Sequence, residues 1–305
     1  MNSENDMDKT WMGLPYRDEQ PARTNQEIRH RHESNRAAWN EAAARYTEQV
    51  DQTIAFLRTG QSSIHPIERK NLARFSPAQG KPGRLLDWCS CAIHLQCASG
   101  RDTLSLWNEG AKRVVGIDIS DAHITNAIAI SSALKAPAEW HRCDVLDPPH
   151  ELDGKADLVY TGRGALCWLH DLDGWAAVIC RLLRPGGLFS LLDDHPFTWL
   201  FDTSAKTLIP SEVDYFSYAE ASRGWGSNYI GNLGIPVEQQ AVKHERLWTL
   251  SMVFQSLRNA GLDILYLGEH PDPYWDSFPN LNPETRKKIP LTFSIVAKKP
   301  GKETK

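Results

Sequence analysis

The sequence predicts an α/β protein built on a mainly parallel seven-stranded sheet with helices on both faces. Two observations predict this fold: short apolar or β-branched runs alternate with helical segments over residues 92–192, and turn-forming residues separate them. Strands and helices that alternate at this spacing form βαβ units, whose strands are parallel. With 305 residues and 41% hydrophobic side chains, the chain can form one large domain with appended segments.

Charge and composition narrow the expected partners. The formal net charge is −4, whereas a nucleic-acid-binding surface usually needs a basic excess. No apolar run reaches the ~18 residues of a membrane-spanning helix, and the polar N-terminus lacks the features of a secretory signal. The six cysteines lie mostly in apolar stretches, and Cys89-Ser-Cys91 lacks the second pair that a structural zinc site needs. We therefore expect a cytosolic protein without nucleic acid, membrane or metal as a partner.

The N-terminal part is expected to contain a tail and a helical cap. Residues 1–30 are rich in polar and charged side chains and are predicted to form a disordered or loosely docked tail, with His30-Arg31-His32 as a solvated stretch. Apolar side chains at three- and four-residue steps predict a helix over 35–57. A short helix near 67–75, among turn residues, completes a cap over residues 31–82.

The main domain is predicted to cover residues 83–298, followed by a C-terminal tail at 299–305. Its strands are expected at residues 92–97, 113–118, 139–143, 156–160, 188–192, 262–267 and 291–297. Its helices are expected at residues 102–109, 123–134, 172–183 and 246–259. Residues 197–240, after the fifth strand, are aromatic and glycine-rich without a clear period. We interpret them as an insertion that covers one end of the sheet.

The ends of the first three strands carry the pattern of a ligand site. In an open α/β sheet, ligands bind beyond the carboxyl ends of the strands. The small residues Ala98-Ser99-Gly100 let the backbone approach a ligand, and Asp118 is placed where a carboxylate accepts from ribose hydroxyls. Asp144 follows the third strand, where it can accept from an adenine amino group. These residues fit S-adenosylmethionine (SAM) or NAD, but the single glycine disfavours the pyrophosphate of NAD.

Several segments together resemble a family of class I SAM-dependent methyltransferases found in bacteria and fungi. The first motif of that family reads roughly LHLQCxxGxDTLSL, and the corresponding run here extends from His94 to Leu106. Further matching segments are Val115–Ser120, Asp144, Asp157–Gly162, Gly164–Trp168, Leu182–Gly187, Trp39–Glu41, His195–Pro196, Glu269–Pro271 and Pro290–Phe293. The resemblance implies a Rossmann-like SAM methyltransferase fold over most of residues 35–298, with SAM as the cofactor.

Eleven positions take a cofactor role from this resemblance. By the part of SAM that each would contact, they are Gln96, Cys97, Ala98 and Gly100 at the methionine moiety; Asp118 and Ile119 at the ribose; Asp144 and Val145 at the adenine; Thr161 and Gly162 at the sulfonium and substrate; and Trp39, closing over the cofactor.

The chain departs from the family in two places. His94 replaces the acid that is usual in the first motif of the broader class, and Gln96 and Ala98 replace two of its glycines. In addition, about seven residues, Asp87–Ile93, look inserted before His94 and are expected to form a bulge or loop beside the cofactor turn. This insertion supports an alternative function, a SAM-binding pseudoenzyme or regulatory protein. An NAD-linked oxidoreductase is a further alternative.

Methyl transfer requires that donor and acceptor are held in line, with a base where the acceptor carries a proton. His195 is the candidate base and Asp194 the second candidate; otherwise His195 is a turn residue that bonds the backbone. Aromatic residues of the insertion either form a substrate lid or pack on the sheet, and they are Tyr215, Phe216, Tyr218, Trp225 and Tyr229. This aromatic insertion favours a flat small-molecule acceptor, with N or O as the methylated atom, and secondary metabolism is a candidate setting.

Overall fold

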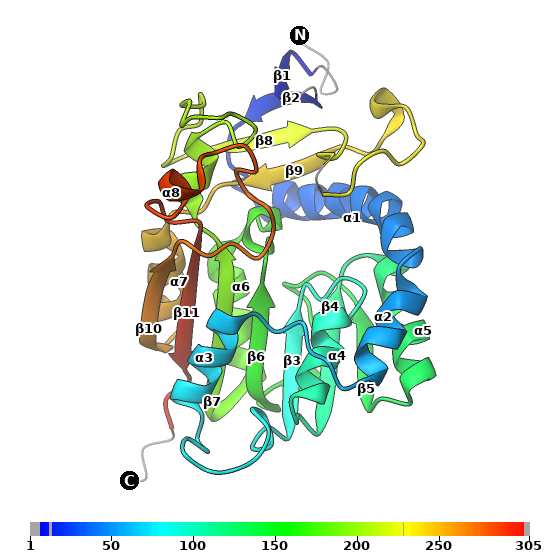
Figure 1. Ribbon diagram of the computed structural model, residues 1–305, viewed down its shortest axis with the longest axis vertical. Helices are drawn as coiled ribbons and strands as arrows, with labels where there is room; N and C mark the ends of the chain where they lie inside the picture. The colour runs from blue at the N-terminus through cyan, green and yellow to red at the C-terminus, as the bar shows by residue number, and fades with distance from the viewer. Residues whose placement is uncertain (1–6, 12–13, 228, 302–305) are drawn as a thin grey trace.

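The computed structural model describes residues 7–11, 14–227 and 229–301 and contains the expected seven-stranded sheet. The strand order is β10-β11-β7-β6-β3-β4-β5 (Figure 1). Its strands are β3 (Cys91–Leu95), β4 (Arg113–Asp118), β5 (Ala138–Arg142), β6 (Ala156–Gly162), β7 (Leu183–Asp194), β10 (Asp263–His270) and β11 (Thr292–Lys298). β5, β4, β3, β6 and β7 pair in parallel, whereas β11 is antiparallel to both β7 and β10. The α/β fold with a mainly parallel sheet is confirmed.

Helices cover both faces of this sheet because successive strand residues point to opposite sides. Ile93 packs in one hydrophobic core with residues of α6 (Leu172–Leu182) and α7 (Leu250–Asn259). Ala92 packs in the other core, which contains residues of four further helices. Those helices are α2 (Val50–Arg58), α3 (Pro66–Phe75), α4 (Arg101–Asn108) and α5 (Asp121–Leu134).

A second, smaller sheet and the first helix lie across the carboxyl end of the main sheet (Figure 1). All pairs in the small sheet are antiparallel, in the order β1-β2-β8-β9. Its elements are β1 (Lys9–Trp11), β2 (Leu14–Glu19), β8 (Ala219–Ser222) and β9 (Lys243–Arg246), and the helix beneath it is α1 (Asn25–Thr47). The short remaining elements are α8 (Pro283–Arg286), η1 (His150–Leu152), η2 (Leu166–Trp168), η3 (Pro196–Leu200) and η4 (Val237–Gln239). We call α1 and this sheet the roof.

Three predictions about the N-terminal part and about helix α7 are wrong. The described part of residues 1–30 is not a disordered tail, because β2 pairs with β8 and a capping box of Thr24 and Glu27 starts α1. Residues 1–6, 12–13 and 302–305 lie outside the described part. The helix predicted over 35–57 is two helices that break near Gln49. α7 begins only after its N-cap Thr249, since the residues up to Arg246 form β9.

The segment Asp87–Ile93, expected to form a bulge or loop, is instead part of the fold. Its last three residues open β3, and Cys89 is fully buried. The Asp157 carboxylate accepts from the backbone N–H groups of Ser90 and Cys91, at 2.8 and 2.9 Å. The segment therefore builds the start of the first strand and leaves the turn after that strand intact.

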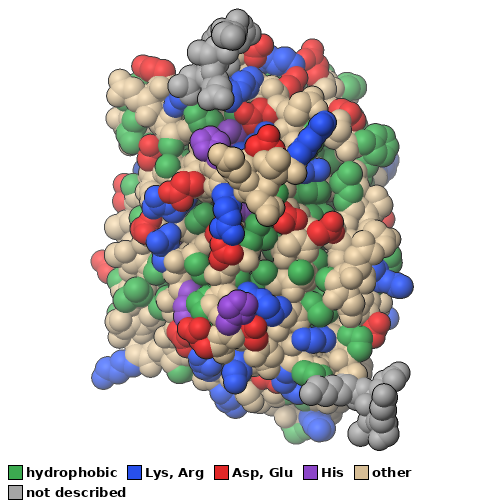
Figure 2. Space-filling model, turned by 180° about the vertical axis from the view of Figure 1, so that it is seen from behind, with side chains coloured by type: hydrophobic (Ala, Val, Ile, Leu, Met, Phe, Trp, Pro, Cys, Tyr) green, Lys and Arg blue, Asp and Glu red, His purple; other side chains and the backbone are tan. Residues whose placement is uncertain are grey.

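Charges of both signs share the surface. On the face shown in Figure 2, Lys and Arg side chains are interspersed with Asp and Glu side chains. Among the residues that the structure describes, no helix is long and apolar enough to cross a membrane. In the same residues, no group of three or more His, Cys, Asp or Glu side chains could hold a metal ion.

Candidate cofactor-binding site

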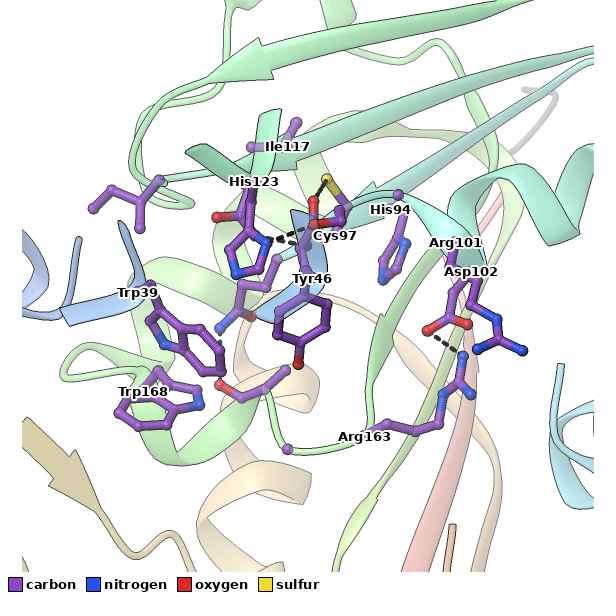
Figure 3. A pocket seen from close by; sticks show the side chains of 18 of the residues that line it. Trp39, Tyr46, His94, Cys97, Arg101, Asp102, Ile117, His123, Arg163 and Trp168 are labelled. Atoms are coloured by element: carbon purple, nitrogen blue, oxygen red, sulfur yellow. Dashed lines mark hydrogen bonds and ion pairs between the residues drawn. The ribbon is translucent and has the colours of Figure 1, made fainter. Parts of the chain in front are cut away.

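A cavity of about 260 Å³ lies between the carboxyl end of the main sheet and the roof (Figure 3). Ten of the eleven predicted cofactor residues line it: Trp39, Gln96, Cys97, Ala98, Gly100, Asp118, Ile119, Asp144, Val145 and Gly162. These residues come from α1 and from the ends of β3, β4, β5 and β6. The structure thus brings together residues that are more than 100 positions apart in the chain.

The turn after β3 has a left-handed backbone at three alternate positions. Gln96, Ala98 and Gly100 have φ values of 58°, 45° and 79°. A Cβ atom at Gly100 would lie 2.4 Å from the Trp140 ring, so only glycine fits there. Gln96 and Ala98 adopt a conformation that L side chains rarely adopt, which places backbone strain at the site.

Asp118 is held in place by the turn that it faces. Its Oδ2 atom accepts from the Ala98 backbone N–H at 2.8 Å, and its Oδ1 atom accepts from the Ser120 N–H at 2.9 Å. Each carboxylate oxygen has a second lone pair, so Asp118 retains the capacity to accept from ribose hydroxyls.

Two buried polar atoms on the cavity wall have no partner among the described residues. The Gln96 amide donates through Nε2 to the Ala165 carbonyl at 2.8 Å, but its Oε1 atom accepts nothing. His123 bonds the Ser99 hydroxyl through Nδ1 at 2.8 Å, and its Nε2 atom is unpartnered. Burial lowers the pKa of His123, which favours the neutral ring. Because buried polar groups are normally paired, these atoms indicate a polar ligand in the cavity.

One end of the cavity is ionic, which the sequence analysis missed. Figure 3 shows Arg163 beside Asp102, with which it forms an ion pair. Arg163 also donates to the hydroxyl of Tyr160, and that hydroxyl donates to the buried Glu68 at 2.6 Å. Burial lowers the pKa of His94 to about 4, so this replacement for the motif acid is neutral at pH 7. Glu68 comes from α3, and no sequence signal places that helix here.

The opposite end is aromatic (Figure 3). The Trp39 ring lies 5.2 Å from Trp168, 4.8 Å from Trp225 and 6.2 Å from Tyr229. Trp39, Trp168 and Tyr229 line the cavity, whereas Trp225 packs against all three without lining it. We call these four residues the aromatic wall.

The other three aromatic residues proposed as a lid do not line the cavity. The side chain of Phe216 is 73% exposed and packs on the Tyr215 ring, while the Tyr218 hydroxyl donates to Glu220. Of the five aromatic residues proposed as a lid, Tyr229 alone lines the cavity, and the lid role stays a prediction.

Three predicted site residues lie outside the cavity. Thr161 is fully buried, and its hydroxyl donates to the Leu95 carbonyl at 3.0 Å, which ties β6 to β3. His195 caps η3 by accepting from the Phe197 N–H at 3.1 Å, and its Nε2 lies 2.8 Å from Glu269. This is the backbone-bonding turn role considered as the alternative, so the structure does not support His195 as the base.

Asp194, the second candidate base, does not line the cavity, and its Oδ1 atom accepts from the Trp275 indole N–H at 2.9 Å. Its neighbour Asp193 accepts from the backbone N–H groups of Gly164 and Leu166, at 2.6 and 3.0 Å; these bonds favour the charge on Asp193, but burial raises its pKa overall. Burial, together with that neighbouring charge, raises the pKa of Asp194 to about 7. The Tyr274 hydroxyl lies 3.4 Å from Asp193. It also faces the cavity residue Gly164, where an added Cβ atom would lie 3.6 Å from it.

Comparison with known proteins defines the class of the domain. Residues 92–187 match the family model described as a methyltransferase domain. An uncharacterized methyltransferase of Synechocystis sp. is 30% identical over 148 residues, which are 47% of this chain and 59% of that protein. The chain thus spans about three fifths of the curated relative that it matches.

Solved structures share the fold. A putative SAM-dependent methyltransferase from Listeria monocytogenes has a TM-score of 0.52 at 20% identity, covering 80% of this chain and 99% of that chain. A SAM-dependent methyltransferase from Clostridium acetobutylicum has a TM-score of 0.51 at 12% identity, covering 78% and 93%. Residues 92–187 therefore match a methyltransferase domain, and the chain shares the Rossmann-like fold of these SAM-dependent methyltransferase structures. SAM is the cofactor of this class.

Proposed function

We propose that this chain transfers a methyl group from SAM to a small, flat organic acceptor, at a nitrogen or oxygen atom. The observation that carries the proposal is one cavity with Asp118 and Asp144 on its sheet side and the aromatic wall at one end. A role in secondary metabolism is the setting that we propose for it.

The residues of the cavity fit SAM. Asp118 would accept from the ribose hydroxyls and Asp144 from the adenine amino group. The unpartnered Gln96 Oε1 is a suitable acceptor for the methionine ammonium group, close to the strained turn. SAM supplies a methyl group already activated by a sulfonium, so the protein mainly has to hold donor and acceptor in line and exclude water.

The aromatic wall supports a flat acceptor. Indole and phenol rings offer large π faces that stack on planar groups and attract cations such as a sulfonium. Lys243 lies on the far side of this wall, with its Nζ atom 5.5 Å from the Trp225 ring centre, and is bonded to Ser222 and Glu245. The buried ammonium group of Lys243, paired with Glu245, thus contacts the Trp225 ring of the aromatic wall.

For an acceptor that must lose a proton, we propose Asp194 as the base in place of His195. A carboxyl with a pKa of about 7 can take up a proton near neutral pH. Because Asp194 does not line the cavity, the acceptor, or one water molecule, would have to reach beyond the cavity lining to meet it.

One observation favours a second function. Neither of the two predicted catalytic residues lines the cavity, as expected for a SAM-binding pseudoenzyme or regulatory protein. Such a protein would bind SAM without producing S-adenosylhomocysteine.

Calorimetric titration with SAM, S-adenosylhomocysteine and NAD tests the cofactor first. We expect micromolar binding of the first two ligands and none of NAD. Release of S-adenosylhomocysteine with a panel of aromatic amines and phenols then tests turnover, with Trp168→Leu as the variant that should lower turnover at subsaturating acceptor. Binding without release on any acceptor would favour the pseudoenzyme, and absence of SAM binding would refute both functions.

A further inference from the structure

We propose that His32 is a positioning residue for adenine. It holds Asp144 as a hydrogen-bond acceptor and so links the packing of α1 to the selection of adenine over other purines. This inference rests on the proposed function, in which Asp144 contacts the adenine of SAM. The sequence analysis expected His32 in a solvated stretch, but its side chain is only 5% exposed.

The contacts of His32 determine which ring nitrogen carries the proton. Its Nε2 atom lies 3.1 Å from the backbone nitrogen of His170, and a backbone N–H can only donate. Nε2 must therefore accept, and in the neutral ring the proton is on Nδ1. Nδ1 lies 2.8 Å from Oδ2 of Asp144, so this nitrogen donates to the carboxylate.

Asp144 is consequently held at both oxygens. Oδ2 accepts from His32, and Oδ1 accepts from the Leu146 N–H at 2.9 Å. Burial opposes the charge on Asp144, but these hydrogen bonds and the nearby Arg29 lower its pKa overall. An ionised carboxylate can accept but cannot donate.

This state of Asp144 distinguishes two purine bases. The 6-amino group of adenine donates a hydrogen bond, whereas the 6-oxo group of hypoxanthine only accepts. A carboxylate that is fixed as an acceptor favours adenine and repels the oxo group. Without the His32 donor, Asp144 is free to rotate or to take up a proton. The ratio of the affinities for adenine and hypoxanthine ligands should then become smaller.

The same helix closes the cavity. α1 also contributes Trp39 and Tyr46 to the lining, and Asn35 anchors it to β9 through two hydrogen bonds with the backbone of His244. His32 meets Asp144 only when α1 is seated in this way. Docking of the roof and recognition of the base therefore share one contact.

The test compares two ligands on matched variants. Calorimetry measures the affinities of S-adenosylhomocysteine and S-inosylhomocysteine, which carry adenine and hypoxanthine respectively. For His32→Leu, which removes the donor, we expect the affinity ratio to fall about tenfold, as for loss of one hydrogen bond to a charged group. His32→Asn places an amide N–H near the position of Nδ1 and should restore most of the ratio.

Ser34→Ala is the control on the same helix. It removes a 2.6 Å hydrogen bond from the Ser34 hydroxyl to the Val242 carbonyl and does not alter the cavity lining. We expect it to leave the ratio unchanged, even if both affinities fall. An unchanged ratio in His32→Leu, with both ligands weakened equally, would overturn the inference while leaving the proposed function in place. If the wild-type chain binds neither ligand, the proposed function fails and the inference falls with it.

A measurement on the wild-type protein does not depend on folding of the variants. Nitrogen NMR of histidine-labelled protein, with His32→Asn used to assign the signal, should find the proton of His32 on Nδ1. A proton on Nε2 would contradict the inference.

Discussion

The floor and the roof of the cavity are built in different ways. The floor consists of turns directly after β3, β4 and β5, where the two carboxylates each accept from a backbone N–H two residues further on: Asp118 from Ser120 and Asp144 from Leu146. The roof depends on contacts between residues about 200 positions apart, such as Asn35 with His244. Because the two parts use different contacts, substitutions should separate cofactor affinity from the stability of the roof.

The largest effect is expected at the floor. Asp118→Ala removes an acceptor for two ribose hydroxyls, and hydrogen bonds to charged groups contribute about 1.5–3 kcal/mol each. The affinity for S-adenosylhomocysteine, measured by calorimetry, should therefore fall by about a hundredfold or more. Hydrogen exchange of β8 and β9 should be unchanged. A variant with nearly wild-type affinity would remove Asp118 from the site.

The converse experiment targets the roof. Asn35→Ala leaves the backbone N–H and carbonyl of His244 without their buried partner, which should cost about 2–3 kcal/mol in the free energy of unfolding of the roof. Amide exchange should accelerate in β8 and β9 and stay slow in β3 and β4. Equal acceleration in both sheets would show that floor and roof unfold as one unit.

The stability of the protein should depend on pH through the Asp194 carboxyl at the end of β7. The raised pKa of Asp194 means that the folded state keeps a proton that the unfolded chain loses near pH 4. Stability should therefore fall as pH rises from about 4 through 7, and Asp194→Asn should reduce this loss, while the raised pKa of Asp193 leaves part of it. Denaturant unfolding should find the variant more stable at pH 8, by on the order of 1–2 kcal/mol, with a smaller difference at pH 5.

The control for this prediction is Glu151→Gln, which changes an exposed carboxylate. This variant should show no such gain in stability between pH 5 and pH 8. If both variants give the same pH profile, burial of Asp194 is not the cause.

The smallest effect is expected in the strained turn. Ala98→Gly replaces an L residue at φ 45° by the residue that adopts this conformation freely, so stability should rise by about 1 kcal/mol. Cofactor affinity should stay within about twofold, because the Ala98 N–H that bonds Asp118 is retained. Thermal unfolding and calorimetry measure the two quantities, and a loss of stability would show that the methyl group packs favourably.

This division also explains how far the sequence alone could predict the molecule. The main sheet follows from local periodicity, and the small turn at residues 98–100, Asp118 and Asp144 follow from small residues and strand ends, which neighbouring residues determine. The other cofactor positions come from the family resemblance. The small sheet of the roof was missed because the segment at Leu14–Glu19 is polar, and its partner β8 is distant in sequence. His32, Glu68 and Arg163 were missed for the same reason, since their burial depends on tertiary contacts.

The predicted base shows a different limit. His195 follows a strand end, as site residues often do, but a residue at that end of a sheet can also lie outside the cavity. The local sequence His195-Pro196 fits a helix cap as well as a base, and in the structure the His195 Nδ1 atom accepts from the Phe197 N–H outside the cavity lining.

The pairing of β2 with β8 has a consequence for biosynthesis. Tyr16 leaves the ribosome before its partner Ser222 has been translated, so the first hairpin must wait for about two thirds of the chain. Until then its edge is exposed and open to wrong partners. Bulky fusions at the N-terminus should therefore lower the yield of folded protein more than the same fusions at the C-terminus.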